Sequence, residues 1–246
     1  MQWSDEGIVL ASRAHGERAL VVQVLTREHG RHAGLLRGGQ SPKIRAQWQI
    51  GNRLVVTWRA RLAEHLGFLT GELLEAHAAK LLDDRLRLAA LAAAASLAAA
   101  ALPEREPHPR AYRGLLHLIE ALAADDRWAI AYVEWEMMLL EELGFGLDLS
   151  SCAATGATHD LVFVSPRSGQ AVSAAAGAPY REKLLPLPGF LRGESATPSP
   201  RDVLDALRLA GFFLEQRVFA PHQRKLPAAR SRYVDALAKV FAIPAS

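Results

Sequence analysis

The only cysteine of the chain, Cys152, lies in residues 143–180, a segment with the turns and short extended runs of a small zinc-binding module. A thiolate is a strong zinc ligand, but structural zinc requires four ligands in a tetrahedral arrangement. His159 can supply a second ligand, and two are too few. The residue types therefore predict a metal-free loop in which Cys152 is a small buried apolar side chain rather than a reactive thiol.

Motifs for catalysis are missing from the sequence. There is no G-x-x-x-x-G-K-[ST] phosphate loop, no H-E-x-x-H, no G-x-S-x-G and no glycine pattern for a dinucleotide after a strand. His159, Asp160 and Ser165 have the residue types of a hydrolytic triad, but adjacent side chains rarely serve one site, and triads are defined by geometry. We therefore expect neither an enzyme nor a cofactor.

Basic residues gather on and beside the first third of the chain, and two tryptophans lie among them. A basic groove with aromatic surfaces is the usual means of binding single-stranded nucleic acid. The alternative is a set of solvated side chains around tryptophans that belong to the core. The candidate DNA-binding residues are Arg13, Arg18, Arg37, Lys43, Arg45, Trp48, Arg59 and Arg61, with a second group, Arg224, Lys225 and Arg230, near Arg232 at the other end of the chain.

The net charge of +3 hides an uneven distribution. Residues 1–63 carry ten Lys or Arg against four Asp or Glu, residues 64–150 carry seven against fifteen, and residues 151–246 carry twelve against seven. Clustered cations gain affinity for a polyanion by releasing counterions from its phosphates. The basic ends favour a nucleic-acid partner, although ordinary solvated faces explain the composition equally well.

Length and composition bound the architecture and the compartment. A chain of 246 residues, half of them apolar, buries a substantial core in one large domain or two smaller ones. The longest apolar run, residues 88–102, is shorter than a membrane span and predicts a buried helix. The first residues, "MQWSDEG", do not resemble a signal peptide, and one cysteine cannot form an internal disulfide, so we expect a cytoplasmic protein without membrane contact.

Two patterns divide the chain near residue 77. Five extended runs rich in Val, Ile, Leu and Thr, separated by turns with glycine, charge or proline, predict strands over 7–14, 19–26, 32–38, 53–60 and 64–74. Five strands in about 70 residues suit a small barrel of the OB type. We read the glycine-rich "GLLRGG" as a turn and "RGGQSPKIRAQWQ" as a flexible basic connection.

Helical patterns dominate the remainder of the chain. They predict helices over 78–101, 109–124, 128–143 and 200–219, and a last one over 227–242. Asp125 and Asp126 are candidate N-caps for the third helix, and Ser199 or Pro200 marks the start of the fourth. The expected fold class is α+β, with an OB-type nucleic-acid-binding domain over 1–77 and a helical domain over 78–246 that contains a small β-containing loop at 146–180.

Several segments, in this order, resemble the bacterial RecO family. They are "EGIVLASRAHGERALVVQVLTREHGRHAGLLRGG", "LLEELGFGLDLSSCAATG", "VSPRSGQAVS" and "LPLPGFL", and the resemblance spans residues 3–240. Each motif is weak alone, and their succession is the specific signal. The resemblance implies an OB domain followed by a helical domain in a DNA repair protein and recombination mediator that binds single- and double-stranded DNA and anneals complementary strands.

The resemblance also bears on the cysteine. Many members of the family carry two C-x-x-C pairs here; in this sequence Cys152 matches the first ligand, Thr155 stands at the second, and the later pair falls in "VSAAA", residues 172–176. The loop is then a remnant without metal, held by the apolar strand 161–164 and the turn at "SPRSG".

The resemblance further implies two protein partners, RecR and the acidic tail of the single-stranded-DNA-binding protein, and a nucleoid location. An acidic, apolar-ended tail needs a hydrophobic pocket with a basic rim. The candidates are Arg110, Tyr112, Arg113, Arg127 and Trp128, with Arg208 and Arg217 closing the pocket. Alternatively, these arginines only balance the glutamates of neighbouring helices.

Our reading is a non-catalytic mediator that helps to load recombinase onto coated single strands. The alternative is a protein-interaction scaffold whose OB barrel binds a protein tail. A steep loss of DNA affinity with salt distinguishes the two.

Overall fold

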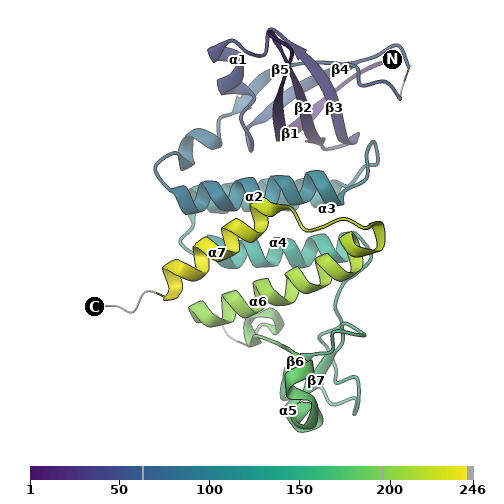
Figure 1. Cartoon of the computed structure of the whole chain (residues 1–246), viewed down its shortest axis with the longest axis vertical. Helices are drawn as coiled ribbons and strands as arrows, with labels where there is room; N and C mark the ends of the chain where they lie inside the picture. The colour runs from purple at the N-terminus through teal and green to yellow at the C-terminus, as the bar shows by residue number, and fades with distance from the viewer. Residues whose placement is uncertain (63, 195–196, 243–246) are drawn as a thin grey trace. The chain divides into compact units, whose positions relative to one another are not determined.

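The computed structural model describes residues 1–62, 64–194 and 197–242. The fold is α+β, as predicted, with five strands first and mainly helices after them (Figure 1). The chain forms two compact units, residues 1–128 with 227–233 and residues 129–226 with 234 onward. Among the described residues, no helix combines the length and the apolar character that a membrane span needs.

The first five strands form one closed sheet, here called the N-terminal sheet. They are β1 Gln2–His15, β2 Ala19–Thr26, β3 Gly30–Arg37, β4 Arg53–Arg59 and β5 Phe68–Glu75. The hydrogen-bonded order is β1-β2-β3-β5-β4, and β4 pairs again with β1. Of the neighbouring strands that the structure describes in this sheet, β3 and β5 run parallel and the others antiparallel. Each of the five predicted strands is confirmed, with β1 longer than expected.

The core of this sheet follows from the alternation of its strands, since successive side chains point to opposite faces. Val22, Val24, Leu54 and Val56 are fully buried. The indole of Trp58 lies among them, and its Nε1 donates to the carbonyls of Ala33 and Leu66, at 3.2 and 3.0 Å. Burial of this large ring is possible because its one polar group is satisfied.

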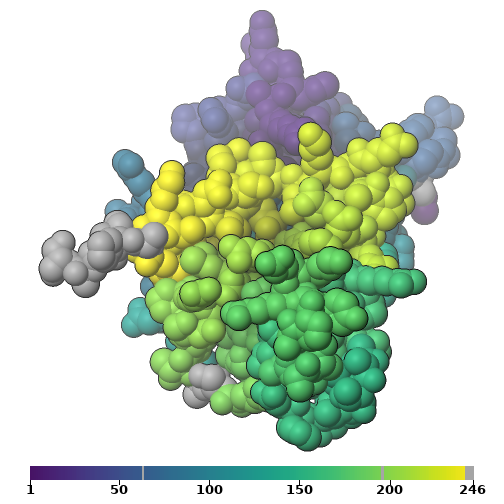
Figure 2. All heavy atoms as spheres, turned by 60° about the horizontal axis from the view of Figure 1, so that its bottom comes forward, coloured from purple at the N-terminus to yellow at the C-terminus, as the bar shows by residue number. Residues whose placement is uncertain are grey.

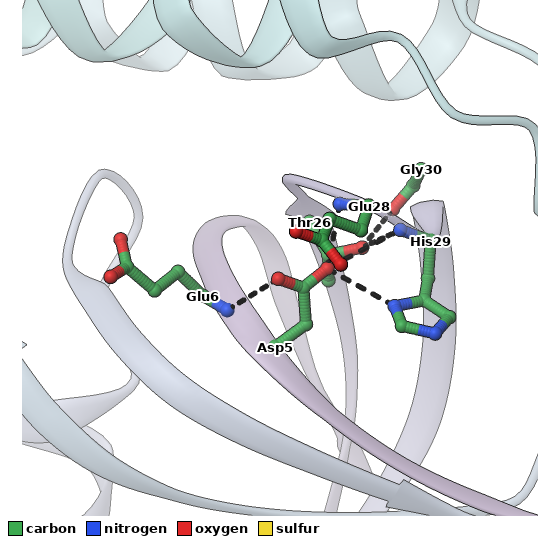
Figure 3. A network of polar contacts seen from close by, with 6 residues as sticks. All are labelled: Asp5, Glu6, Thr26, Glu28, His29 and Gly30. Atoms are coloured by element: carbon green, nitrogen blue, oxygen red, sulfur yellow. Dashed lines mark hydrogen bonds and ion pairs between the residues drawn. The ribbon is translucent and has the colours of Figure 1, made fainter.

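The turn between β2 and β3 is organised by Asp5 of β1 (Figure 3). The carboxylate of Asp5 accepts from the backbone N–H of Glu28 at 2.7 Å and lies 3.1 Å from Nδ1 of His29. Thr26 donates through Oγ1 to the carbonyl of Gly30 at 2.9 Å. Figure 3 shows the side chain of Glu6 extending away from this network. The turn is therefore held from a neighbouring strand as well as by its own bonds.

The basic connection after β3 contains a helix that the sequence reading missed. The turn expected at "GLLRGG" is right only for its last two residues, because residues 34–37 belong to β3 and the turn is at residues 38–40. Pro42–Gln47 is helix α1. Pro42 is at the helix start, where a fixed φ is favourable and no N–H is needed. Trp48 closes α1 with a backbone bond to Ile44 at 3.0 Å and is buried in the sheet core. The prediction of a flexible connection was wrong because this packing stabilises a helix too short to stand alone.

Three long helices follow the sheet, after a 3₁₀ turn, η1, at Ala78–Leu81. They are α2 Arg85–Ala101, α3 Pro109–Ala124 and α4 Trp128–Glu142. The first begins at residue 85 rather than 78 because Asp84 accepts from the N–H groups of Leu86 and Arg87, at 2.9 and 3.0 Å. Before α4, Asp125 accepts from the N–H of Arg127 at 2.7 Å.

The segment between α4 and α6 builds a small sheet of order β7-β6-β8. Its parts are β6 Leu161–Val164, β7 Ala171–Ser173, α5 Ala174–Gly177, a 3₁₀ turn η2 Ala178–Lys183, β8 Leu185–Pro186 and a 3₁₀ turn η3 Gly189–Arg192. The predicted strand 161–164 is confirmed. The space-filling view shows these residues, in green, as a lobe beside the yellow-green α6, and β8 and η3 contact that helix (Figure 2).

From residue 200 to residue 242 the described chain is mainly helical. Helix α6, Pro200–Phe213, starts at a capping box in which Ser199 and Asp202 bond reciprocally. A π-helical segment, η4 Leu214–Phe219, and a 3₁₀ turn, η5 Ala220–His222, follow it, so the predicted extent to 219 is right although the last turns are not α-helical. The last helix, α7, is Ala228–Ala242.

Candidate nucleic-acid interface

A row of outward side chains runs across the N-terminal sheet. Arg13 pairs with Val21, Val21 with Leu35, Leu35 with Phe68, and Phe68 with Arg59. Directly paired residues of neighbouring strands project from the same face. The arginines and Phe68 are exposed, and Val21 and Leu35 are half-buried. This cross-strand row therefore has an apolar centre between two positive charges.

A hollow of about 890 Å³ opens at Phe68, here called the arginine pocket. Met1, the end of β3, the β4–β5 loop and the start of β5 line it. Its charged side chains are Arg37, Arg59 and Arg61, with His65 beside them, and no carboxylate of the described residues lines it. Charges of one sign in a concave wall attract an anion more strongly than the same charges on a flat surface.

Phe68 gives the arginine pocket an aromatic surface. Phe68 is 41 % exposed, and the guanidinium carbon of Arg37 lies 4.2 Å from the centre of its ring. An exposed ring beside cations matches the way proteins stack nucleobases, which is worth roughly 1 to 3 kcal/mol per base. The sequence reading missed Phe68. The available signal was alternation, since the next residue, Leu69, is a core side chain and Phe68 must then face outward.

The β4–β5 loop that forms one wall of the pocket is anchored at both ends. Ala60 donates its N–H to the carbonyl of Met1 at 3.0 Å, and the carbonyl of Leu66 accepts from Trp58. Gly67 has φ 68°, and a Cβ there would lie 2.5 Å from Nε1 of Trp58. Only glycine combines that backbone conformation with this close approach. The loop is thus held against the core at the point where the chain enters β5.

The predicted basic residues of the first region do not all converge. Arg37, Arg59 and Arg61 line the arginine pocket, and Arg18 is exposed in the turn beside the pair Ala19–Arg37. Lys43 and Arg45 are exposed on α1. Arg45 lines a second hollow of about 720 Å³, formed mainly by apolar residues of β1, α1 and α2. Arg37 and Arg45 therefore belong to different surfaces.

The aromatic part of the prediction needs correction. Trp48 and Trp58 are each 2 % exposed and belong to the core of the sheet. Neither can offer a ring face to a base, so the alternative interpretation of core tryptophans is the right one. Bulk and apolarity drove both indoles inward, and Phe68 occupies the exposed position instead.

The second basic group is only partly on the surface. Arg224 and Lys225 are exposed between η5 and α7, and the guanidinium of Arg224 lies 5.4 Å from the centre of the Phe219 ring. Arg230 is buried on α7 and takes part in interactions within the protein. Its assignment to a DNA surface is wrong, because a buried guanidinium does not reach a phosphate.

The candidate peptide residues divide in the same way. Arg110, Arg113 and Arg127 are exposed, whereas Tyr112 and Trp128 are buried and do not form an open pocket. The hydroxyl of Tyr112 contacts Oε2 of Glu6 at 3.4 Å. Burial, with the charge of Glu6, raises the pKa of Tyr112 to about 12. These two aromatic residues are structural, since they stabilise the interior.

Two further arginines were expected to close that pocket. Arg208 pairs with Asp205 at 3.0 Å, one turn away on α6. Arg217 donates to the backbone carbonyl of Arg167. Both guanidinium groups therefore bond to other groups of the protein.

The loop around Cys152 is organised by hydrogen bonds to the cysteine. Its N–H donates to Ala157 at 2.7 Å, its carbonyl accepts from Gly156 at 2.8 Å, and its Sγ accepts from the N–H of Ser173 at 3.3 Å. Bonds from Thr155 and Ser173 lower the pKa of the thiol to about 6. Cys152 is buried, as predicted. In the part of the chain that the structure describes, no three His, Cys, Asp or Glu side chains gather as a metal site.

Comparisons with known proteins agree with these features. Residues 1–77 match the family described as Recombination protein O N terminal, and residues 82–226 match Recombination protein O C terminal. The DNA repair protein RecO of Rhodospirillum centenum is 54% identical over 237 residues, which cover 96% of this chain and 94% of that protein. The proteins of the same name from Rhodospirillum rubrum and a Ruegeria species are 51% and 48% identical, over 96% and 97% of this chain and 96% and 99% of their own lengths. The chain therefore belongs to the RecO family.

Proposed function

We propose that this protein acts in DNA repair as a recombination mediator that binds single-stranded DNA in the arginine pocket. The observation that carries the proposal is the convergence of Arg37, Arg59 and Arg61 around the exposed ring of Phe68. Three guanidinium groups suit the phosphates of a flexible backbone, and the ring suits one base. A single strand fits this arrangement because its bases are free to leave the stack.

The same chemistry supports annealing of complementary strands without catalysis. Two strands repel each other through their phosphates, and cations on the protein lower that repulsion. The cross-strand row contacts backbone and base faces, so the base edges stay available for pairing. To help load recombinase onto coated single strands, the protein must likewise hold a strand by its backbone and leave the base edges free. Duplex DNA needs only the phosphate contacts, for which exposed Arg18, Lys43, Arg224 and Lys225 provide further charge.

The remaining parts of the proposal rest on the family. We place RecR and the acidic tail of the single-stranded-DNA-binding protein among the partners, in the bacterial cytoplasm at the nucleoid. Arg110, Arg113 and Arg127 are the exposed cations that support a tail-binding rim. The apolar part of such a site must come from residues other than Tyr112 and Trp128, because both are buried.

A second function, a scaffold that binds a protein tail, is favoured by one observation. The hollow that Arg45 lines is mostly apolar, and Leu82 at its edge is 61 % exposed. Such a surface suits an apolar peptide with an acidic neighbour. Binding of this type depends weakly on salt, whereas DNA binding depends steeply on it.

A titration of labelled single-stranded DNA across salt concentrations tests the proposed function. The expected result is a binding constant whose logarithm falls linearly with the logarithm of the salt concentration, at a slope of about −0.7 for each phosphate neutralised. The alanine variant of Arg59 should give a shallower slope than the wild type. Flat salt dependence, or equal slopes, would favour the scaffold.

A further inference from the structure

The connection between α2 and α3 is bonded to the N-terminal sheet. Arg31 of β3 pairs with Glu104 in a parallel bridge, and the two side chains form an ion pair at 3.1 Å. Arg31 also donates through Nε to the carbonyl of Leu102 at 2.9 Å, and the N–H of Arg105 donates to the carbonyl of Arg31 at 2.9 Å. This connection therefore continues the hydrogen bonding of β3.

Close packing at the β2–β3 turn fixes the same place from the other side. Gly30 has φ 68°, and a Cβ there would lie 1.9 Å from the carbonyl oxygen of Glu106. No other residue type fits so close to that backbone. The turn is itself held by Asp5 (Figure 3). The position of the α2–α3 connection, which carries Arg105, is thus fixed by its contacts with β3 and with the β2–β3 turn.

Arg105 links the α2–α3 connection to the β4–β5 loop. Its Nη2 donates to the carbonyls of Glu64 and His65, at 2.9 and 3.2 Å. Its backbone has φ 62°, which is uncommon for a residue with a side chain and persists only where surrounding contacts require it. Arg105 is exposed, yet its side chain connects two segments some forty residues apart in the sequence.

We propose that Arg105 is a positioning residue for the arginine pocket. The β4–β5 loop is anchored at its ends by the bonds of Ala60 and Trp58. Arg105 bonds to the middle of the loop, at the carbonyls of Glu64 and His65. Arg61 and His65, which line the pocket, lie on either side of Glu64. By holding the two carbonyls, Arg105 orders these side chains before DNA arrives, so that less freedom is lost on binding. This inference rests on the proposed function.

Three variants separate positioning from direct contact. Arg105→Ala removes the guanidinium, and Arg105→Lys keeps the charge without the planar donor group. Arg85→Ala is the matched control, since Arg85 is exposed on α2, lines neither hollow and carries the same charge. Amide hydrogen exchange of the 59–68 peptide is measured without DNA, and affinity for a labelled single strand is measured across salt.

The expected result for Arg105→Ala is faster exchange of the loop peptide and an affinity lower by about fivefold, with the salt slope of the wild type. The slope is unchanged because a positioning residue neutralises no phosphate, whereas loss of a direct contact makes it shallower by about 0.7. Arg105→Lys should resemble Arg105→Ala, and Arg85→Ala should resemble the wild type.

Exchange that stays at the wild-type rate in Arg105→Ala would overturn the inference, and so would a shallower slope. Faster exchange with undiminished affinity would overturn the link to DNA. In that case Arg59→Ala distinguishes the two proposals. If Arg59→Ala weakens binding, the pocket stands and only the role of Arg105 fails; if it does not, the pocket itself is not the DNA site.

Discussion

The guanidinium carbon of Arg37 lies 4.2 Å from the centre of the Phe68 ring. The two residues come from β3 and β5, the one parallel pair of the N-terminal sheet as described, where Leu35 and Phe68 are partners. A cation over an exposed ring is a surface that accepts a base and a phosphate together. This candidate interface therefore depends on sheet topology, because residues 31 positions apart meet only when β5 enters between β3 and β4.

Phe68→Ala should weaken binding of single-stranded DNA by about 5- to 150-fold, as expected for the loss of one stacked base. The salt slope should not change, because no charge is removed. The matched control is Phe145→Ala, which removes another exposed ring of similar exposure. Fluorescence anisotropy measures both. Equal affinities for the two variants would mean that Phe68 contacts no base.

Gly67→Ala should lower the free energy of unfolding by about 2 to 4 kcal/mol, because the added Cβ is strained at φ 68° and meets the ring of Trp58. Gly16→Ala is the control, since Gly16 has φ 60° but nothing within 4 Å of the added carbon. Its cost should be only about 1 kcal/mol. Urea denaturation compares them, and a Gly67 variant as stable as the Gly16 variant would show that the loop is not held against Trp58.

The unfolding free energy should depend on pH through His32. Burial first, and then the charges of Arg105 and His29, lower the pKa of His32 from 6.5 to about 4. Between these values the unfolded chain binds the proton and the folded protein does not, so stability is complete above pH 6.5 and falls as the pH falls towards 4. From pH 7.5 to 5 the loss is about 1 to 2 kcal/mol.

His32→Gln removes this titration while keeping a neutral polar side chain. Urea titrations at the two pH values should show a smaller pH-dependent loss for the variant than for the wild type. Burial also lowers the pKa of His77, which is unchanged in both proteins and cancels in the comparison. Identical pH dependence of wild type and variant would show that His32 titrates normally in the folded state.

Cys152 should react with a thiol reagent far more slowly in the folded protein than in urea, because access rather than the pKa limits the reaction of a buried thiol.

The purified protein should hold no stoichiometric zinc, and a chelator should leave its unfolding midpoint unchanged, since folding is not linked to metal here. Elemental analysis and thermal denaturation measure these properties. One zinc per chain, or a midpoint lowered by chelator, would contradict the account of this loop.

The sequence predicts much of this fold because local patterns carry most of the information. The strands follow from alternation around Val22 and Val56, and α6 from its capping residues. Helix α1 was missed because a six-residue helix is stabilised by the burial of Trp48, which no local pattern displays. The start of α2 was placed too early because it depends on which polar residue caps the helix, and Asp84 is the one that does so.

The sequence indicates the charged residues of the candidate site but not its aromatic or positioning residues, which depend on tertiary packing. Positive charge is visible in a sequence, and Arg37, Arg59 and Arg61 were found in this way. Which aromatic residue faces outward depends on tertiary packing, so Trp48 was named as a candidate although it is buried, and the exposed Phe68 was missed. Arg105 left no signal, because its bonds go to main-chain carbonyls, which every residue possesses.

The central claim is that the arginine pocket neutralises the phosphates of bound single-stranded DNA. The direct measurement is the salt slope of affinity for a protein in which Arg37, Arg59 and Arg61 are replaced by Ala. Its control replaces three exposed cations outside the pocket, Arg85, Arg201 and Lys239, and so removes the same charge. We predict a slope shallower by about 2 for the pocket variant and a nearly unchanged slope for the control. Equal slopes for the two triple variants would contradict the claim and place the DNA on another surface.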